Sequence, residues 1–312
     1  MLTTPIVRAL KNCVKNVELH YLTKPENETL LKNNKYIDKL HLLKNDLSET
    51  TDELSKEEFG YVVDLQKNLR SLRIKKALGV RASSFPKLNI RKWLFVNLKL
   101  QCMPAIHIVD RYFEAVRDLE VVNDGKGLDY FLQEADFVDC ETLPAGFQSG
   151  YVACVVGSKH ATKQMPTDLM ADLCRKIQKP IILLGGKGDR DKAAIIGQQV
   201  GAKVFNACGN YNINQSAYLV KNALGIITPD TGLMHIAAAF DKNIIAVWGN
   251  TVPQFGMYPY RAANAKGKTY NFEVKNLHCR PCSKLGYAEC PKKHFRCMLG
   301  QDTDKIAEIA NA

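Results

Sequence analysis

The chain has 312 residues, 46% of them hydrophobic and 24% charged, and a formal net charge of +11. This composition excludes a disordered or fibrous chain, and the length favours two domains over one. No apolar run reaches the roughly 18 residues of a membrane span. The positive charge predicts an anionic partner, a condition that nucleic acid, an anionic membrane surface and a phosphorylated substrate all meet.

The first half of the chain has the pattern of short strands alternating with helices. Thr4 followed by Pro5 predicts a helix that begins the chain, with no strand before it. Apolar runs and helical periodicity then predict strands at 17–22, 37–43 and 61–65, and a helix at 107–119.

The pattern is clearer after the turn-rich stretch 143–150. It predicts strands at 151–156, 180–184, 203–205, 225–228 and 244–248, and helices at 166–177, 191–200, 214–222 and 231–240. Short apolar strands that alternate with helices indicate parallel sheets covered by helices on both faces. We therefore expect an α/β protein of two Rossmann-like domains, residues 1–145 and 146–312, facing a cleft.

Basic residues are concentrated in one segment. Residues 65–100 contain ten Lys or Arg and no acidic residue, whereas residues 101–150 contain three basic and ten acidic residues. No nucleic-acid-binding module is recognisable in the basic segment, and its aromatic residues lack the pattern of a stacking platform. Anionic lipid headgroups or a phosphorylated glycan would suit it equally well.

The strongest motif is the stretch 226–239, in which a buried strand leads through a tight turn into an Ala-rich helix. The helix N-terminus is an anion site, where Thr231 can donate its hydroxyl and Gly232 lets a phosphate approach the backbone. His235 lies one turn further along and can face the same ligand. Plain N-capping by Asp230 or Thr231, with His235 in the core, would explain the same residues.

Two further loops follow predicted strands. In the first, Ser158, Thr162 and Lys163 could neutralise a diphosphate without a metal ion, although a lone Lys is more commonly a solvated loop residue. In the second, a Gly-Gly turn precedes Asp189, which could hold a ribose hydroxyl. Together the three loops are better evidence of a ligand-binding site than any one of them. All three follow the carboxyl ends of predicted parallel strands, where open α/β sheets bind ligands.

Four of the ten cysteines, Cys279, Cys282, Cys290 and Cys297, have a C-x2-C-x7-C-x6-C spacing. This spacing is compatible with a zinc site of four thiolates, but it contains only one C-x2-C pair. Buried or unpaired thiols are the alternative, and the other six cysteines show no ligand spacing. Residues 1–5 lack the layout of a secretory signal, so thiols or metal ligands are favoured over disulfides.

These motifs resemble those of glycosyltransferase family 9, the ADP-heptose:lipopolysaccharide heptosyltransferases and their relatives. Residues 228–235, Thr-Pro-Asp-Thr-Gly-Leu-Met-His, resemble the family's D-T/S-G-L-x-H motif. Residues 64–71 are similar to its acceptor-side segment, and residues 157–166 to its diphosphate loop. Trp248-Gly249-Asn250-Thr251 and the cysteine-rich stretch 277–298 also recur in the family. The similarity extends over nearly the whole chain.

The resemblance implies a GT-B fold, with the acceptor on the N-terminal domain and the nucleotide sugar on the C-terminal one. It implies an inverting, metal-independent transfer that needs no cofactor, with heptose, from ADP-heptose, as the family's best-known sugar. The acceptor would be a lipid-linked anionic glycan of the lipopolysaccharide type, met by a cytoplasmic enzyme at the inner face of the membrane. Donor-binding residues would be Ser158, Thr162, Lys163, Asp189, Asp230, Thr231, Gly232 and His235; acceptor-binding residues would be Arg70 and Arg111.

One departure concerns the general base. Family members have a strand and a Gly-Asp pair before the segment that matches Leu2-Thr3-Thr4-Pro5, and that Asp is the proposed base. Met1 occupies the position after it, so we expect little transferase activity and poor solubility from the chain as written. Three explanations are open: a start codon assigned too late, a truncated chain, or a degenerate family member that binds its ligands without catalysis. Two other readings remain: a non-catalytic nucleotide-sugar-binding protein, and a zinc-bearing nucleic-acid binder, which the lack of a module disfavours.

Overall fold

The computed structural model describes the backbone of residues 1–312 and all side chains except that of Cys140. In the N-terminal half the helices are α1 (Thr4–Cys13), α2 (Glu28–Leu31), α3 (Leu47–Ser55), α4 (Leu69–Leu78), α5 (Asn89–Leu98) and α6 (Ile108–Phe113), and the strands are β1 (His20–Thr23), β2 (Lys39–Leu42), β3 (Tyr61–Asp64) and β4 (Arg81–Ser84). The strands expected at 17–22, 37–43 and 61–65 are therefore present, as is the opening helix at Thr4. The helix expected at 107–119 is α-helical only to Phe113 and continues as a 3₁₀ helix to Leu119.

The C-terminal half contains every strand and helix that the sequence predicts there. Its strands are β5 (Val152–Val155), β6 (Ile181–Leu184), β7 (Val204–Asn206), β8 (Gly225–Pro229), β9 (Asn243–Trp248) and β10 (Thr269–Glu273), and its helices are α7 (Thr167–Lys176), α8 (Arg190–Val200), α9 (Ile213–Asn222), α10 (Gly232–Ala239), α11 (Arg296–Leu299) and α12 (Thr303–Asn311). Only β10, α11 and α12 were not expected.

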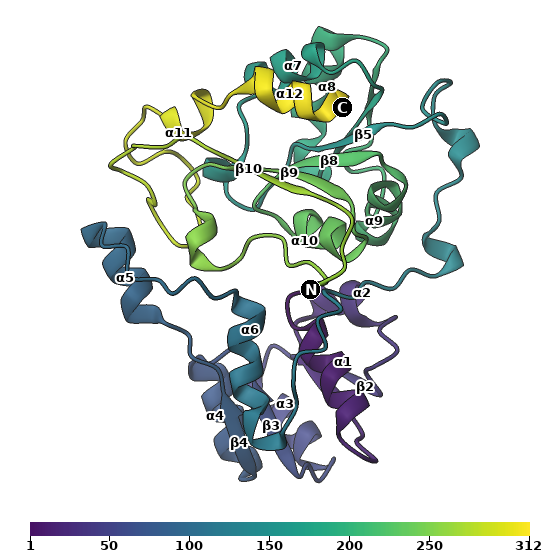
Figure 1. Ribbon diagram of the computed structural model, residues 1–312. Coiled ribbons are helices and arrows are strands. Elements are labelled where there is room, and N and C mark those ends of the chain that lie inside the picture. Colours follow the sequence, from purple (N-terminus) through teal and green to yellow (C-terminus); the bar gives the residue numbers. More distant parts are fainter.

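The six C-terminal strands form one parallel sheet in the order β10-β9-β8-β5-β6-β7. Successive side chains of a strand point to opposite faces, so a strand covered on both faces is apolar throughout. In β6, Ile181 and Leu183 pack in the core with α7, α8 and α12, whereas Ile182 and Leu184 pack in the core with α9 and α10. Figure 1 shows these two helical layers on either side of the sheet.

The N-terminal strands form two separate parallel pairs, β1-β2 and β3-β4, rather than one continuous sheet. The helices of this half join the larger core: Ile6 of α1 and Val109 of α6 belong to the same buried cluster as Met234 of α10. The N-terminal elements therefore lie on the α10 side of the six-stranded sheet (Figure 1). The predicted division between residues 145 and 146 stays a prediction.

Across the described residues, no helix combines the length and the apolar character that crossing a membrane requires.

Candidate functional site

The loops that follow β5, β6 and β8 lie at the same edge of the sheet. These three strands are parallel neighbours in the order β8-β5-β6, so their carboxyl ends and the loops after them are adjacent. The loop after β8 leads into α10, the loop after β5 carries Lys163, and the loop after β6 carries Asp189. The structure thus brings together the three loops that the sequence singled out.

The N-terminus of α10 is open to a ligand. Thr231 is the N-cap residue, yet its side chain makes no capping hydrogen bond; its hydroxyl lies 3.1 Å from the hydroxyl of the buried Thr228. Apart from its chain neighbours and the backbone of its own helix, nothing lies within 4 Å of a Cβ built on Gly232, and the first turn contains no acidic residue. The plain N-capping that would explain this turn is therefore not made, and the helix presents free N–H groups and its positive dipole end.

Lys163 is held beside this helix end by an ion pair. Its ammonium donates to Asp230 Oδ2 at 2.6 Å, and the Thr251 hydroxyl donates to the same oxygen at 3.1 Å. The Lys163 and Asp230 side chains are only 14% and 15% exposed. Such a shielded, charge-assisted bond fixes the ammonium in place. The arrangement places one cation and one helix N-terminus at the end of the same strand.

His235 and Asn250 present buried polar atoms without partners. His235 Nδ1 and Asn250 Oδ1 are buried and make no hydrogen bond in the described structure. Burial lowers the pKa of His235 to about 4, so its imidazole is neutral at pH 7. Buried polar atoms are nearly always satisfied, and unsatisfied ones call for an explanation. A bound polar ligand would provide it for both side chains.

Of the three other predicted donor residues, Thr162 and Asp189 have side-chain hydrogen bonds to nearby backbone groups. The Thr162 hydroxyl accepts from the Tyr287 N–H at 2.8 Å and donates to the Tyr287 carbonyl at 3.2 Å, so here it joins two loops. Asp189 Oδ2 accepts from the Gly186 N–H at 2.8 Å. The side chain of Ser158 is half-buried in the loop after β5. Contact of these three residues with a nucleotide stays a prediction.

The two predicted acceptor residues lie in different surroundings. Arg70 is exposed on α4, while Arg111 of α6 is 3% exposed. One Arg111 nitrogen, Nη2, donates to the Phe255 carbonyl at 3.0 Å, and Nε and Nη1 are buried without a partner. Burial lowers the pKa of Arg111. An unpaired buried guanidinium is costly, so an anion in contact with it would be stabilised.

Lys92 extends this positive region and was not predicted as a site residue. Its pKa is lowered to about 8, first by burial and then by the positive charges of Arg111, Lys284 and Lys87. The only sign of it in the sequence is its place in the basic segment 65–100, which does not distinguish it from nine other cations. Cations that lower the pKa of a neighbouring cation create a positive region that a bound anion would neutralise.

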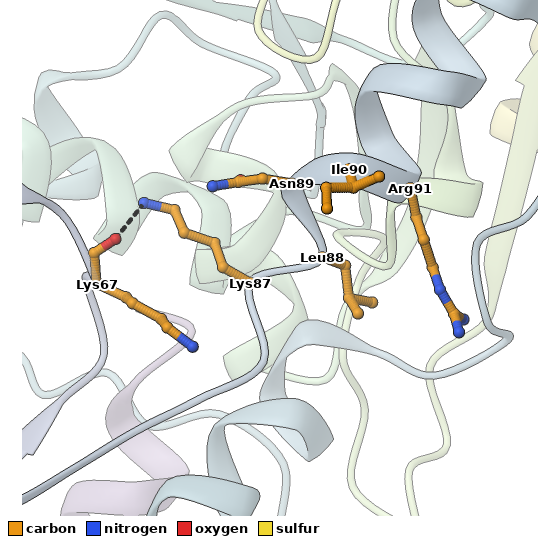
Figure 2. Close-up of a pocket in the computed structure, with 6 residues that line it drawn as sticks. All are labelled: Lys67, Lys87, Leu88, Asn89, Ile90 and Arg91. Atoms are coloured by element: carbon orange, nitrogen blue, oxygen red, sulfur yellow. Dashed lines mark hydrogen bonds between the residues drawn. The ribbon is translucent and has the colours of Figure 1, made fainter.

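A pocket of about 470 Å³ opens in the same basic segment. It is lined by Lys67, Lys87, Leu88, Asn89, Ile90 and Arg91. Figure 2 shows the Lys87 ammonium directed to the backbone carbonyl of Lys67, a hydrogen bond of 3.2 Å. The Lys67 and Arg91 side chains complete a basic lining. Arg70 does not line this pocket.

The four cysteines of the C-x2-C-x7-C-x6-C spacing do not gather as a close group in the structure. In the part of the chain that it describes, no three of Cys279, Cys282, Cys290 and Cys297 have their sulfurs within 4.8 Å of one another. Burial raises the pKa of Cys282 to about 12 and that of Cys297 to about 11. The zinc site of four thiolates and the alternative of buried or unpaired thiols both stay predictions.

Arg280 and the loop after β9 were also missed as parts of the site. Arg280 donates to the carbonyls of Gly249, Val274 and Thr251 at 2.6, 2.7 and 3.0 Å, and it forms an ion pair with Glu273. These bonds fix the loop that carries Thr251. No spacing in the sequence signals an arginine that binds backbone carbonyls.

The family model for "Glycosyltransferase family 9 (heptosyltransferase)" matches residues 49–287. A lipooligosaccharide heptosyltransferase 2 of Haemophilus influenzae is 44% identical over 50 residues, which are 16% of this chain and 14% of that protein. One of Campylobacter jejuni is 30% identical over 109 residues, 35% of this chain and 31% of that protein. The alignments thus span less than a third of these relatives.

Solved structures are similar over nearly the whole chain. A glycosyl transferase family 9 protein of Veillonella parvula has a TM-score of 0.76 at 18% identity, and Escherichia coli ADP-heptose LPS heptosyltransferase II has 0.74 at 13% identity. Each comparison covers 99% of this chain and 93% of the other. They confirm the predicted α/β fold of the GT-B type. Because the family model spans well over half of the sequence, the chain belongs to glycosyltransferase family 9.

Proposed function

We propose that this chain is an inverting, metal-independent glycosyltransferase that moves heptose from a nucleoside diphosphate sugar to an anionic acceptor of the lipopolysaccharide type. Its family is that of the heptosyltransferases, and proteins of similar structure include an Escherichia coli heptosyltransferase with ADP. ADP-heptose is accordingly the proposed donor.

On the donor side, the proposed chemistry is stabilisation of the departing diphosphate. Negative charge grows on the diphosphate as the bond to the sugar breaks, and pre-placed donors that face it lower the barrier. The free N–H groups at the start of α10 and the Lys163 ammonium are such donors. Asp230 holds Lys163 in position, and neutral His235 can accept or donate one hydrogen bond. Ser158, Thr162 and Asp189 are the proposed neighbours of the remaining phosphate and ribose groups.

On the acceptor side, Arg111 and Lys92 are the proposed anion-binding residues. Both are cations whose pKa is lowered by burial, and Arg111 has two buried nitrogens without a partner. Arg70 and the basic pocket at Lys67 and Arg91 would meet further phosphates or acidic sugars of the acceptor. The same basic segment would hold the protein at the inner face of the cytoplasmic membrane, beside a lipid-linked acceptor.

A single loop carries the proposal, because it connects the two sides. Three residues of the loop after β9 separate Thr251, whose hydroxyl donates to Asp230, from Phe255, whose carbonyl accepts from Arg111. The donor cation Lys163 and the acceptor cation Arg111 are thus anchored to the two ends of this loop. An inverting transfer needs this juxtaposition, since the acceptor hydroxyl must reach the anomeric carbon opposite the leaving diphosphate.

No described residue of this chain is assigned as the base that takes the acceptor proton. This leaves a second candidate function, a non-catalytic protein that binds nucleotide sugars. Both functions predict binding of the nucleotide sugar, but only the transferase predicts transfer of the sugar to an acceptor.

The experiment measures ADP-heptose binding and heptose transfer on one sample. Only slow transfer to a phosphorylated acceptor is expected from this chain, and Arg111→Gln should weaken acceptor binding about 10-fold or more while ADP affinity stays within about twofold. Arg175→Gln, a surface change on α7, is the matched control. Donor binding without transfer would favour the non-catalytic function. Absence of any ADP binding would refute both.

A further inference from the structure

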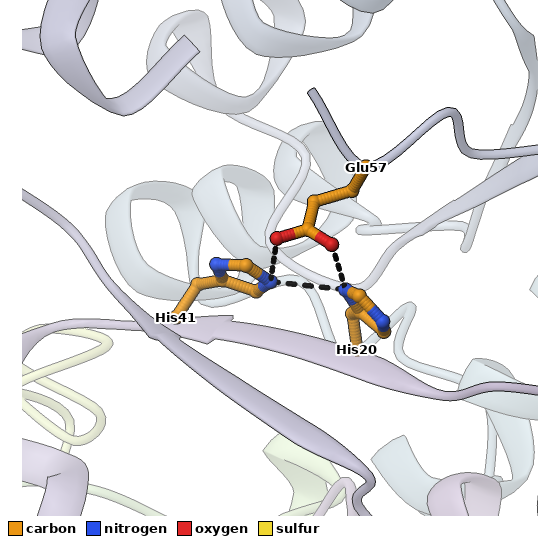
Figure 3. A group of neighbouring side chains, drawn as sticks. All are labelled: His20, His41 and Glu57. Atoms are coloured by element: carbon orange, nitrogen blue, oxygen red, sulfur yellow. Dashed lines mark hydrogen bonds and ion pairs between the residues drawn. The ribbon is translucent and has the colours of Figure 1, made fainter. Parts of the chain in front are cut away.

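Two histidines and a glutamate converge in the N-terminal half, outside the nucleotide site. His20 is the first residue of β1, His41 lies near the middle of β2, and Glu57 follows α3. The parallel register pairs His20 with Lys39 and Leu22 with His41, so both imidazoles extend from the same face of the two strands. Figure 3 shows the two rings and the carboxylate directed toward one another.

The distances match a metal site without its ion. His20 Nδ1 lies 3.0 Å from His41 Nε2 and 3.9 Å from Glu57 Oε2, and His41 Nε2 lies 4.0 Å from Glu57 Oε1. Each of the three residues offers one ligand atom within 4.8 Å of the others. Around a tetrahedral ion with bonds of roughly 2.0–2.2 Å, ligand atoms lie about 3.3 Å apart. The observed separations bracket this value.

Each imidazole is also oriented by a second carboxylate on its outer side. His20 Nε2 lies 3.1 Å from Glu18 Oε1, and His41 Nδ1 lies 3.4 Å from Glu53 Oε1. Metal-binding histidines typically donate their other N–H to a carboxylate in this way, which fixes the tautomer. With both outer nitrogens protonated, three acceptor atoms face one another in the centre. Their mutual repulsion requires a proton or a cation between them.

The surroundings shield this centre. The His20 and His41 side chains are 9% and 3% exposed, and the ring of Phe59 packs edge-on against both imidazoles. The Lys39 ammonium contacts Glu57 and would compete with a metal ion for this carboxylate. The Lys39 side chain is half exposed and can turn into solvent. Lys44 pairs with Glu53 on the outer side at 2.8 Å.

We propose that His20, His41 and Glu57 bind one divalent transition-metal ion, with Zn²⁺ as the best-matched ion. Two imidazoles and a carboxylate are borderline nitrogen and oxygen donors that suit Zn²⁺ over Ca²⁺ or Mg²⁺. The fourth position is left to water. The ion would join β1, β2 and the residue that follows α3, so the site stabilises this half of the protein. It takes no part in sugar transfer.

The test is a Zn²⁺ titration of the full chain after a chelator has removed any bound metal. Calorimetry measures the affinity, and the absorption of Co²⁺ in place of Zn²⁺ reports the ligands. We expect one bound Zn²⁺ per chain whose affinity depends on this cluster. Loss of an outer partner alone costs 10- to 100-fold in metal affinity. His41→Gln should therefore weaken binding by more than about 100-fold, and Glu18→Gln by about 10-fold. His278→Gln, a change of an exposed histidine outside the cluster, should leave the affinity unchanged.

Glu18 is largely exposed, so its variant reports on the site even if His41→Gln does not fold. Bound Co²⁺ should lack the near-ultraviolet absorption of a cobalt–thiolate bond, which separates this site from the four cysteines. No saturable Zn²⁺ binding would overturn the proposal. So would binding that is unchanged in Glu18→Gln, or a single equivalent with thiolate absorption.

Discussion

Replacement of Lys163 by Met removes a charged donor beside the start of α10 and keeps the length of the aliphatic chain. In the wild-type protein the ammonium is held at 2.6 Å from Asp230 Oδ2, with both side chains about 85% buried. A hydrogen bond to a charged group contributes roughly 1.5–3 kcal/mol. The predicted loss of ADP affinity is therefore about 10- to 100-fold. The upper end is expected, because the uncovered Asp230 carboxylate then repels the diphosphate.

Isothermal titration with ADP at fixed ionic strength measures this change, and urea unfolding shows whether the variant remains folded. The matched control is Lys159→Met, because Lys159 lies in the same loop and is exposed. Its ADP affinity should stay within about twofold of the wild type, as expected for a solvated charge. A folded Lys163→Met protein that binds ADP as tightly as the control would refute the assignment of Lys163 to the diphosphate.

Three other predictions test the surroundings of the site. Gly249→Ala would place a Cβ 2.7 Å from the Thr162 carbonyl oxygen and 2.6 Å from Met298 Cε, so urea unfolding should show a loss of about 1–3 kcal/mol, and unchanged stability would contradict the packing. Burial lowers the pKa of His235 to about 4, so the unfolded chain binds the extra proton between about pH 6.5 and 4. The unfolding free energy should consequently fall by about 3 kcal/mol as the pH drops through that window, and His235→Gln should remove this part of the pH dependence. The pKa of Lys92 is about 8, so its charge is lost as the pH rises from 7 to 9. Affinity for a phosphorylated acceptor should fall over that range in the wild type and fall less in Lys92→Arg; equal pH profiles would exclude Lys92 from the acceptor site.

The C-terminal strands were predictable because burial on both faces leaves each one as a short apolar run. Ile181–Leu184 is an example, with all four residues fully buried. The strand Arg81–Ser84 was not predictable, because its sequence Arg-Ala-Ser-Ser contains no bulky apolar residue and its pairing with Tyr61–Asp64 supplies the strand geometry. The strand Thr269–Glu273 was not predicted from the sequence for a related reason. It is the edge strand of the sheet, and its side chains are only partly buried.

The site was predictable where its residues lie in one loop and not where they come from several. The turn from Asp230 to His235 is contiguous, so the helix N-terminus that is proposed to bind an anion is visible in the sequence. The ion pair of Lys163 with Asp230 and the effect of Arg111 on Lys92 depend on contacts between distant segments, which no local spacing encodes. Thr162 shows the opposite case: a hydroxyl suited to a phosphate is engaged by the backbone of Tyr287, more than a hundred residues away.

The central claim is that a diphosphate binds at the N-terminus of α10. A crystal structure of the protein with ADP tests it most directly. The account predicts a phosphate oxygen about 3 Å from the backbone nitrogen of Gly232 or Leu233, with the Lys163 ammonium within hydrogen-bonding distance of the same group. ADP bound elsewhere, with this helix end filled by protein side chains, would contradict it.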